Sequence, residues 1–353
     1  MEPSAFDADR ARSALRKGTL SIGLGVVLLV LVLWGAARTP LGAEALGDLL
    51  SSSRPGYLVA SWLIISLAFY FMALRWRSLM PPPHHPPSMG LASIICAGLL
   101  LNYAVPGPFG ELGAAWFAHK RYRVPFSDAL ATGVAARLIG LATAALMALV
   151  IWAVVDLPPP AEQGEVLQRA NELIPVAALA IGAGGVTLFW LALKPSWWRQ
   201  LSARTLGQIS GTGRIAGLAA KLDGAIGAVA GALARTASRG LGAYARTAGW
   251  ALMGHTSVII GIMVAAHGLG AEANLAGLAF TYAATTAGAV ALFAFPASQI
   301  GWDLMFFSLL VAAAGLPAPV AAAIAVLVRL QQLSMMVLGA MALSWLLQRT
   351  AEP

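Results

Sequence analysis

Charged residues and cysteine are scarce in this chain. Only 11% of its 353 residues are charged, whereas ordinary soluble domains carry about 25%. The low charge argues against a soluble globular fold. The 59% hydrophobic content, with a mean hydropathy of +0.76, predicts a protein that lives in a lipid bilayer. The single cysteine, Cys96, excludes a disulfide within the chain.

The sequence patterns of common enzymes and metal sites are also missing. The chain has no His-Glu-x-x-His zinc motif, no Gly-x-x-x-x-Gly-Lys phosphate loop and no Gly-x-Ser-x-Gly nucleophile elbow. The adjacent His84 and His85 lie in a proline-rich run and lack the spaced ligands of a metal site. We therefore predict a protein that is not an enzyme, with no metal, no cofactor and no nucleic-acid partner.

Long hydrophobic runs, in contrast, are abundant. Those of about 20 residues that predict membrane-spanning helices cover residues 18–37, 57–74, 129–155, 173–193, 249–269 and 320–347. Two further runs, 89–119 and 274–314, are interrupted near their middle by proline and glycine. As one helix the first would reach about 46 Å, beyond the hydrocarbon core of about 30 Å. Each of these two runs is therefore expected to form a pair of short helices.

The charges between the hydrophobic runs indicate how the chain crosses the membrane. Basic clusters at 10–17, 75–77, 120–123 and 194–246 predict cytoplasmic segments, and the acidic stretch 156–172 predicts an external loop. This pattern fits a single integral membrane domain with six transmembrane helices, two re-entrant helical hairpins and both termini in the cytoplasm of a bacterial-type inner membrane.

The long basic segment carries a helical pattern of its own. Apolar residues recur at helical spacing from Ile215 to Leu233. This pattern predicts a cytoplasmic interfacial segment within 195–247, and a helix packed across the bundle is the alternative.

An acid, a proline and an arginine occur twice with the same spacing. The proline follows the acid by 14 residues, the arginine follows the proline by 12, and the copies lie 192 residues apart. The two copies are Glu111, Pro125, Arg137 and Asp303, Pro317, Arg329. They indicate a duplication, with repeat 1 at about 57–155 and repeat 2 at about 249–347. Three crossings separate the starts of the repeats, so inverted repeats are expected.

The duplicated charges point to a site inside the membrane. A centred arginine or aspartate costs about 2.5 to 3.5 kcal/mol on insertion scales, so such residues usually face a partner or a transport pathway. Each arginine lies about 18 Å of helix beyond its proline, near the middle of the bilayer core. Each is expected to be balanced by Glu111, by Asp303 or by an anionic substrate. A structural salt bridge is the alternative.

The motifs resemble those of a known membrane family. They are Asn102-x-x-x-Pro106 with Gly110-Glu111, Arg137, Pro296 through Gly301, Gly315-x-Pro317 and Arg329. Over residues 18–347 the chain resembles the flippase-like domains related to the N-terminal half of the multiple peptide resistance factor, the lysylphosphatidylglycerol synthase transmembrane family. The resemblance implies movement of lipids between leaflets, such as aminoacylated phosphatidylglycerol or polyprenyl-linked intermediates.

The chain also departs from that family. Relatives often carry arginine where this chain has Pro108 and glutamate where it has Asp303, so the headgroup preference is expected to differ. The sequence ends at Pro353 without the soluble aminoacyltransferase domain of some relatives, so lipid synthesis is not expected.

The function predicted from the sequence is a flippase-type lipid transporter. A polar cavity between the repeats would admit the anionic headgroup of a membrane lipid. Arg137 and Arg329 would hold its phosphate, while Glu111 and Asp303 would balance the arginines or carry a proton. The predicted site residues are Asn102, Pro106, Gly110, Glu111, Arg137, Pro296, Gly301, Asp303 and Arg329. The alternatives are a secondary transporter of a small soluble anion and a non-transporting membrane scaffold or accessory subunit.

Overall fold

The computed structural model is helical throughout the part of the chain that it describes. Within that part there are turns between the helices and no strand. The described residues are 47–49, 51–81, 85–104, 109–155, 231–232, 234–236, 238–292 and 298–348, with single helical residues at 183, 187, 196, 200 and 227. The predicted all-helical class is therefore confirmed for these residues.

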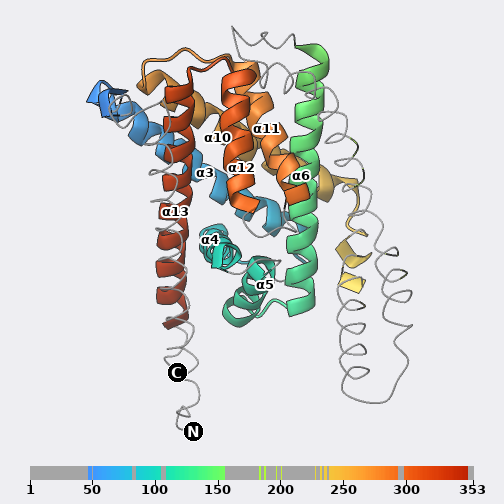
Figure 1. Cartoon of the computed structure of the whole chain (residues 1–353). Coiled ribbons are helices and arrows are strands. Elements are labelled where there is room, and N and C mark those ends of the chain that lie inside the picture. The colour runs from blue at the N-terminus through green and yellow to red at the C-terminus, as the bar shows by residue number, and fades with distance from the viewer. Residues whose placement is uncertain are drawn as a thin grey trace, which may run out of the picture.

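Four long helices form the frame of the fold (Figure 1). They are α3 (Pro55–Leu79), α6 (Phe126–Val154), α10 (Leu241–Gly268) and α13 (Ala318–Gln348). Among the described residues, these are the helices long and apolar enough to cross a membrane. They match the predicted spans 57–74, 129–155, 249–269 and 320–347. The predicted spans 18–37 and 173–193 lie outside the described residues, apart from the single residues 183 and 187.

Each proline-interrupted run forms two helices that pack against each other, as the sequence predicts. The first run contains α4 (Ser88–Ala104) and α5 (Phe109–Tyr122), and the second contains α11 (Leu275–Leu292) and α12 (Ser298–Ala312). These helices have 17, 14, 18 and 15 residues. All are shorter than the roughly 20 residues that a typical spanning helix needs.

Prolines set the start of the helices that carry the duplicated arginines. Pro125 is the N-cap of α6, and Pro317 immediately precedes α13. Proline is tolerated here because the residue before a helix does not use its own N–H in the helix, and its carbonyl accepts the first helical hydrogen bond. Arg137 and Arg329 therefore lie at the same distance along their helices.

The two halves of the chain use the same packing scheme. The most extensively packed pair is α3 with α10, which joins the halves. In this scheme α3, α4, α5 and α6 correspond to α10, α11, α12 and α13, in that order. Each packed pair of helices has a packed counterpart made of the corresponding helices. For example, α4 packs on α13, and α11 packs on α6. In Figure 1, α6 and α13 run in opposite directions, with α5 beside the lower part of α6 and α12 beside the upper part of α13.

Small residues allow α3 and α10 to approach closely. A Cβ at Gly261 would overlap the Ile65 side chain and lie 3.2 Å from the Ser61 carbonyl oxygen, so only glycine fits there. The Ser61 hydroxyl donates a 2.7 Å hydrogen bond to the Gly261 carbonyl. Close approach at small residues is how helices commonly associate in membranes, where apolar burial gives little drive.

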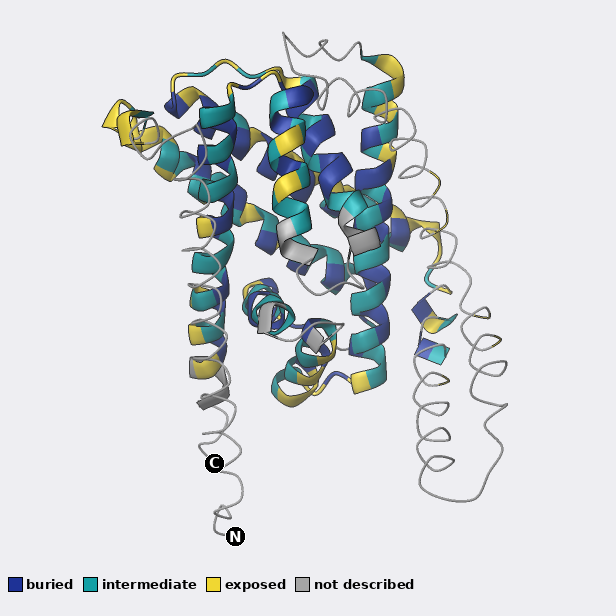
Figure 2. Cartoon of the chain, in the orientation of Figure 1, coloured by how far each residue is buried: buried dark blue, intermediate teal, exposed yellow. Residues whose placement is uncertain are grey.

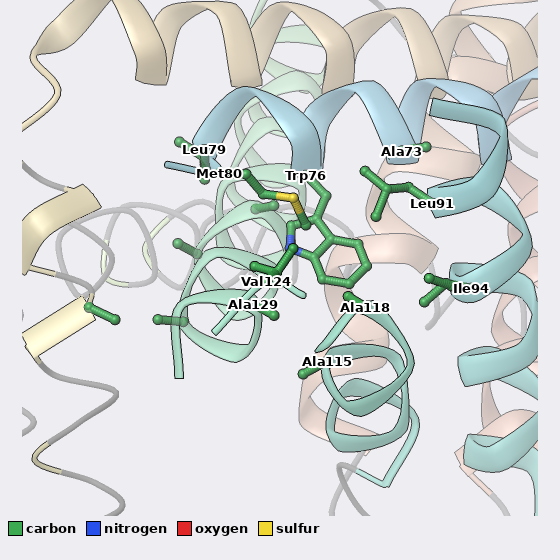
Figure 3. Packing of buried hydrophobic residues seen from close by; sticks show 14 of the residues in the cluster. Ala73, Trp76, Leu79, Met80, Leu91, Ile94, Ala115, Ala118, Val124 and Ala129 are labelled. Atoms are coloured by element: carbon green, nitrogen blue, oxygen red, sulfur yellow. The ribbon is translucent and has the colours of Figure 1, made fainter. Parts of the chain in front are cut away.

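A hydrophobic cluster, made mostly of residues from the first half, surrounds Trp76 (Figure 3). We call α4 with α5, and α11 with α12, the two broken pairs. The same cluster contains Leu91 and Ile94 of α4 and Ala115 and Ala118 of α5, so it ties the first broken pair to α3. The Trp76 indole N–H donates a 3.1 Å hydrogen bond to the Thr132 hydroxyl of α6, so its polar edge is satisfied. The long helices α3 and α6 and the pair α4–α5 are thereby held around one aromatic ring.

The outer faces of the long helices are apolar and exposed. In Figure 2, exposed residues line the outer side of α13, and buried residues face the centre. Large exposed side chains on these faces include Leu63 and Leu67 of α3, Val150 of α6 and Met341 of α13. An exposed apolar surface of this extent suits contact with lipid. The predicted interfacial segment at 195–247 lies mostly outside the described residues, and its last residues, from Leu241, belong to α10.

Candidate functional site

The first duplicated pair forms an ion pair between α5 and α6. Glu111 lies in the first turn of α5, and its carboxylate contacts the Arg137 guanidinium. The Arg137 side chain nevertheless keeps 31% of its surface exposed. The second Glu111 carboxylate oxygen, Oε2, is buried without a hydrogen-bond partner. The ion pair is therefore formed, but part of the arginine side chain remains accessible.

The second duplicated pair forms between α12 and α13 and is tightly enclosed. Arg329 Nη2 lies 2.5 Å from Asp303 Oδ1, and the Arg329 side chain is only 8% exposed. Its Nη1 donates a 2.9 Å hydrogen bond to the Gln332 side chain, and its guanidinium lies 5.4 Å from the centre of the Trp302 ring. Each arginine thus pairs with the acid of its own half, which is one of the pairings expected from the sequence.

A cavity of about 240 Å³ lies beside the first pair, with a wall that is mainly apolar and carries a group of polar side chains. Six helices from both halves contribute to its wall. Its polar or aromatic lining residues are Arg75, Trp76, Asn102, Glu111, Arg137, Trp250, His255, Tyr282 and Thr286. The lining does not include Gly301, Asp303 or Arg329. The two halves therefore share a cavity in which only the first ion pair takes part.

Arg75 is a cavity residue that the sequence analysis did not identify. The sequence predicts a span that ends at Leu74, with Arg75 in the segment after it, but α3 continues to Leu79, so Arg75 lies within the helix. Arg75 lines the cavity close to Arg137 and Tyr282, and its Nε is buried without a hydrogen-bond partner. The sequence did carry a signal, because the first helix-breaking proline is Pro81 rather than a residue near 74.

His255 joins the wall of the cavity from α10. It is 6% exposed, and its Nε2 lies 3.0 Å from the Gly140 carbonyl oxygen of α6. The ring is also 5.7 Å, centre to centre, from Tyr282 of α11. His255 therefore ties together helices from both halves.

Asn102 and Gly110 join the two helices of the first broken pair beside the cavity. The Gly110 N–H donates a 2.6 Å hydrogen bond to the Asn102 side-chain oxygen, linking the end of α4 to the start of α5. A Cβ at Gly98 would lie 2.7 Å from the Gly110 carbonyl oxygen, so the two helices meet at glycine. Pro106 and Pro296 lie outside the described residues. Gly301 is partly buried in α12, two residues before Asp303.

The charged side chains leave the cavity with a net positive charge. Arg75 and Arg137 each carry one positive charge, and Glu111 carries one negative charge. Guanidinium groups bind phosphate and carboxylate oxygens through paired hydrogen bonds. Within the described residues, no group of three or more His, Cys, Asp or Glu side chains is placed to hold a metal ion. The arrangement is therefore suited to holding an anion.

Comparison with known proteins identifies the family. Residues 20–340 match the family described as the lysylphosphatidylglycerol synthase TM region. No curated protein and no solved structure matches the chain. The family match spans nearly all of the described helices, including both ion pairs and the cavity between the halves. The chain therefore belongs to the lysylphosphatidylglycerol synthase transmembrane family.

Proposed function

We propose that this protein is a flippase-type transporter that moves an anionic phospholipid or polyprenyl-linked lipid between the leaflets of a bacterial-type inner membrane. The observation that carries the proposal is the cavity lined by helices of both halves, with the Glu111–Arg137 pair in its wall. Family membership adds a link to membrane lipids. In this proposal the chain has no enzymatic activity of its own.

The repeated packing scheme supports an alternating mechanism. The proposal treats α3 to α6 and α10 to α13 as inverted repeats with α4–α5 and α11–α12 as re-entrant hairpins, an arrangement with cytoplasmic termini. The exchange symmetry of the packed helix pairs and the antiparallel α6 and α13 favour it. In transporters built this way, one repeat rocks against the other around a site near the middle of the membrane.

The role assigned to the second pair changes in this proposal. Arg137 holds the lipid phosphate in the cavity, and Glu111 balances Arg137 when the cavity is empty. The Asp303–Arg329 pair, which is enclosed and is not part of the cavity lining, instead holds α12 against α13. The cavity also argues against a scaffold, because a scaffold predicts a packed centre.

Leaflet-resolved transport in liposomes tests the function. Purified protein is reconstituted with fluorescent phosphatidylglycerol, and loss of fluorescence to an external quencher reports the fraction that has changed leaflet. The wild type is expected to move the lipid, and Arg137→Ala to slow it by at least about tenfold, because a charged hydrogen bond contributes about 1.5 to 3 kcal/mol.

The matched control is Arg235→Ala. Arg235 also pairs with an acid, Asp128, but lies outside the cavity lining. It should transport like the wild type. No transport by the folded wild type would contradict the proposal, and uptake of a soluble anion without lipid movement would favour the secondary-transporter alternative.

A further inference from the structure

Arg75 differs from the two duplicated arginines. Arg137 and Arg329 each contact an acid, whereas no acidic side chain of the described residues pairs with Arg75. A charged group within a membrane is costly unless it is paired, hydrated or bound to a ligand. The arrangement therefore leaves the Arg75 charge available to something that enters the cavity.

The fold holds Arg75 in place. Its guanidinium lies directly against Gly140 of α6, where an added Cβ would overlap Nη1 and lie 2.7 Å from Cζ. The carbonyl of the same glycine contacts the His255 ring of α10 at 3.0 Å. Gly140 of α6 thus leaves space for the Arg75 guanidinium of α3, and His255 of the opposite half contacts the same glycine. The Arg75 side chain is therefore packed in a defined position and does not lie on an open surface.

The polar groups around the cavity form an incomplete network. Arg75 Nε and Glu111 Oε2 are both buried without hydrogen-bond partners, although both residues line the cavity. Buried polar groups without partners are uncommon in native proteins and call for an explanation such as an absent ligand. The Tyr282 and Thr286 side chains of α11 add hydroxyl groups to the same wall.

We propose that Arg75 and Arg137 together form a binding subsite for a phosphodiester monoanion. Two guanidinium groups and one carboxylate give the cavity one net positive charge, which matches the single negative charge of a phosphodiester. A phosphomonoester, which carries up to two negative charges, matches it less well. The inference rests on the proposed function for the source of the phosphodiester, which is the headgroup of a membrane phospholipid.

Ligand binding to Arg75 variants tests the subsite. The purified protein in detergent is titrated with dihexanoyl phosphatidylglycerol, dimethyl phosphate and inorganic phosphate, and binding is followed by calorimetry. Arg75→Gln should weaken phosphatidylglycerol binding by about tenfold or more. Arg75→Lys keeps the charge but loses the paired hydrogen bonds, so it should recover part of the binding.

A matched control and a positioning variant complete the set. Arg77→Gln removes an arginine from the same helix that lies outside the cavity and contacts Ser88, so it should bind like the wild type. Gly140→Ala should weaken binding by pushing the Arg75 guanidinium aside. The Gly140→Ala and Arg75→Gln effects should be less than additive, because both act through one guanidinium. Thermal unfolding of each variant confirms that it is folded.

The outcomes separate this inference from the proposed function. If folded Arg75→Gln binds phosphatidylglycerol as the wild type does while the wild type moves lipid in liposomes, the subsite is wrong and the transport function stands. If the wild type binds dimethyl phosphate but neither binds nor moves lipid, the subsite is supported and the lipid function fails. Tighter binding of inorganic phosphate than of either phosphodiester would overturn the monoanion preference.

Discussion

The two halves of the molecule carry the same ion pair in different surroundings. In the first half, the Arg137 side chain keeps 31% of its surface exposed and borders a cavity, whereas in the second half Arg329 keeps 8% and is covered by Trp302 and Gln332. The spacing of acid, proline and arginine is identical. The difference therefore comes from the neighbours: one copy borders a cavity, and the other is enclosed between two helices.

The comparison extends to the broken pairs. In the first, the Gly110 N–H donates to the Asn102 side chain beside the cavity. In the second, the Thr281 hydroxyl donates a 2.9 Å hydrogen bond to the Leu309 carbonyl. Both bonds join the two helices of a pair, but only the first involves cavity residues. The halves thus share an architecture, but only the first places its ion pair and its inter-helix hydrogen bond at the cavity.

The largest effect is expected from labelling that tests whether the halves are inverted. Single cysteines replace Lys120, after the first broken pair, and Glu272, before the second, in a Cys96→Ser background. Both positions are exposed. Inverted repeats predict that a membrane-impermeant maleimide added to intact cells labels position 272 and leaves position 120 unlabelled until the cells are opened. Labelling of both from outside would contradict the inversion.

Breaking the enclosed pair should cost more stability than breaking the open one. Arg329→Ala leaves Asp303 buried without its partner and is expected to cost about 3 to 5 kcal/mol. Arg137→Ala should cost less, because Glu111 can be hydrated from the cavity. Unfolding in detergent with increasing denaturing surfactant measures both free energies.

A double variant provides the control for this difference. Asp303→Leu with Arg329→Met removes both charges and should be more stable than Arg329→Ala, because no buried charge remains without a partner. Equal losses of unfolding free energy for Arg137→Ala and Arg329→Ala would show that the two pairs have the same role.

A smaller effect is expected at the bonds that close the broken pairs. Asn102→Ala and Thr281→Val each remove one hydrogen bond and should each lower the unfolding free energy by about 1 kcal/mol. Because only Asn102 lines the cavity, only Asn102→Ala should also reduce lipid transport. A transport loss of the same size in Thr281→Val would contradict this expectation, because Thr281 does not line the cavity.

Much of the architecture could be predicted from the sequence. The hydrophobic runs predicted α3, α6, α10 and α13, and the proline and glycine interruptions predicted the two broken pairs, because these signals are local. The pairing of each arginine with an acid was among the expected arrangements, since an isolated charge in a membrane is costly.

The difference between the halves could not be predicted in this way. Identical spacing at Arg137 and Arg329 implied identical roles, whereas the cover over Arg329 comes from the packing of α12 on α13. Pro81 indicated that the helix continues past Arg75, but the contact with Gly140 of another helix, which places Arg75 at the cavity, could not be predicted. Such contacts join segments far apart in the chain and leave no local pattern.

The central claim is that the first pair serves transport and the second serves the fold. It is tested most directly by leaflet-resolved lipid transport of two charge-free variants, with rates expressed per folded protein. These are Glu111→Leu with Arg137→Met and Asp303→Leu with Arg329→Met. The exposed pair Asp128→Asn with Arg235→Gln is the control. The account predicts that the first variant loses at least about 90% of transport while the second and the control stay within about twofold of the wild type. Equal loss in both variants, or full transport by the first, would contradict it.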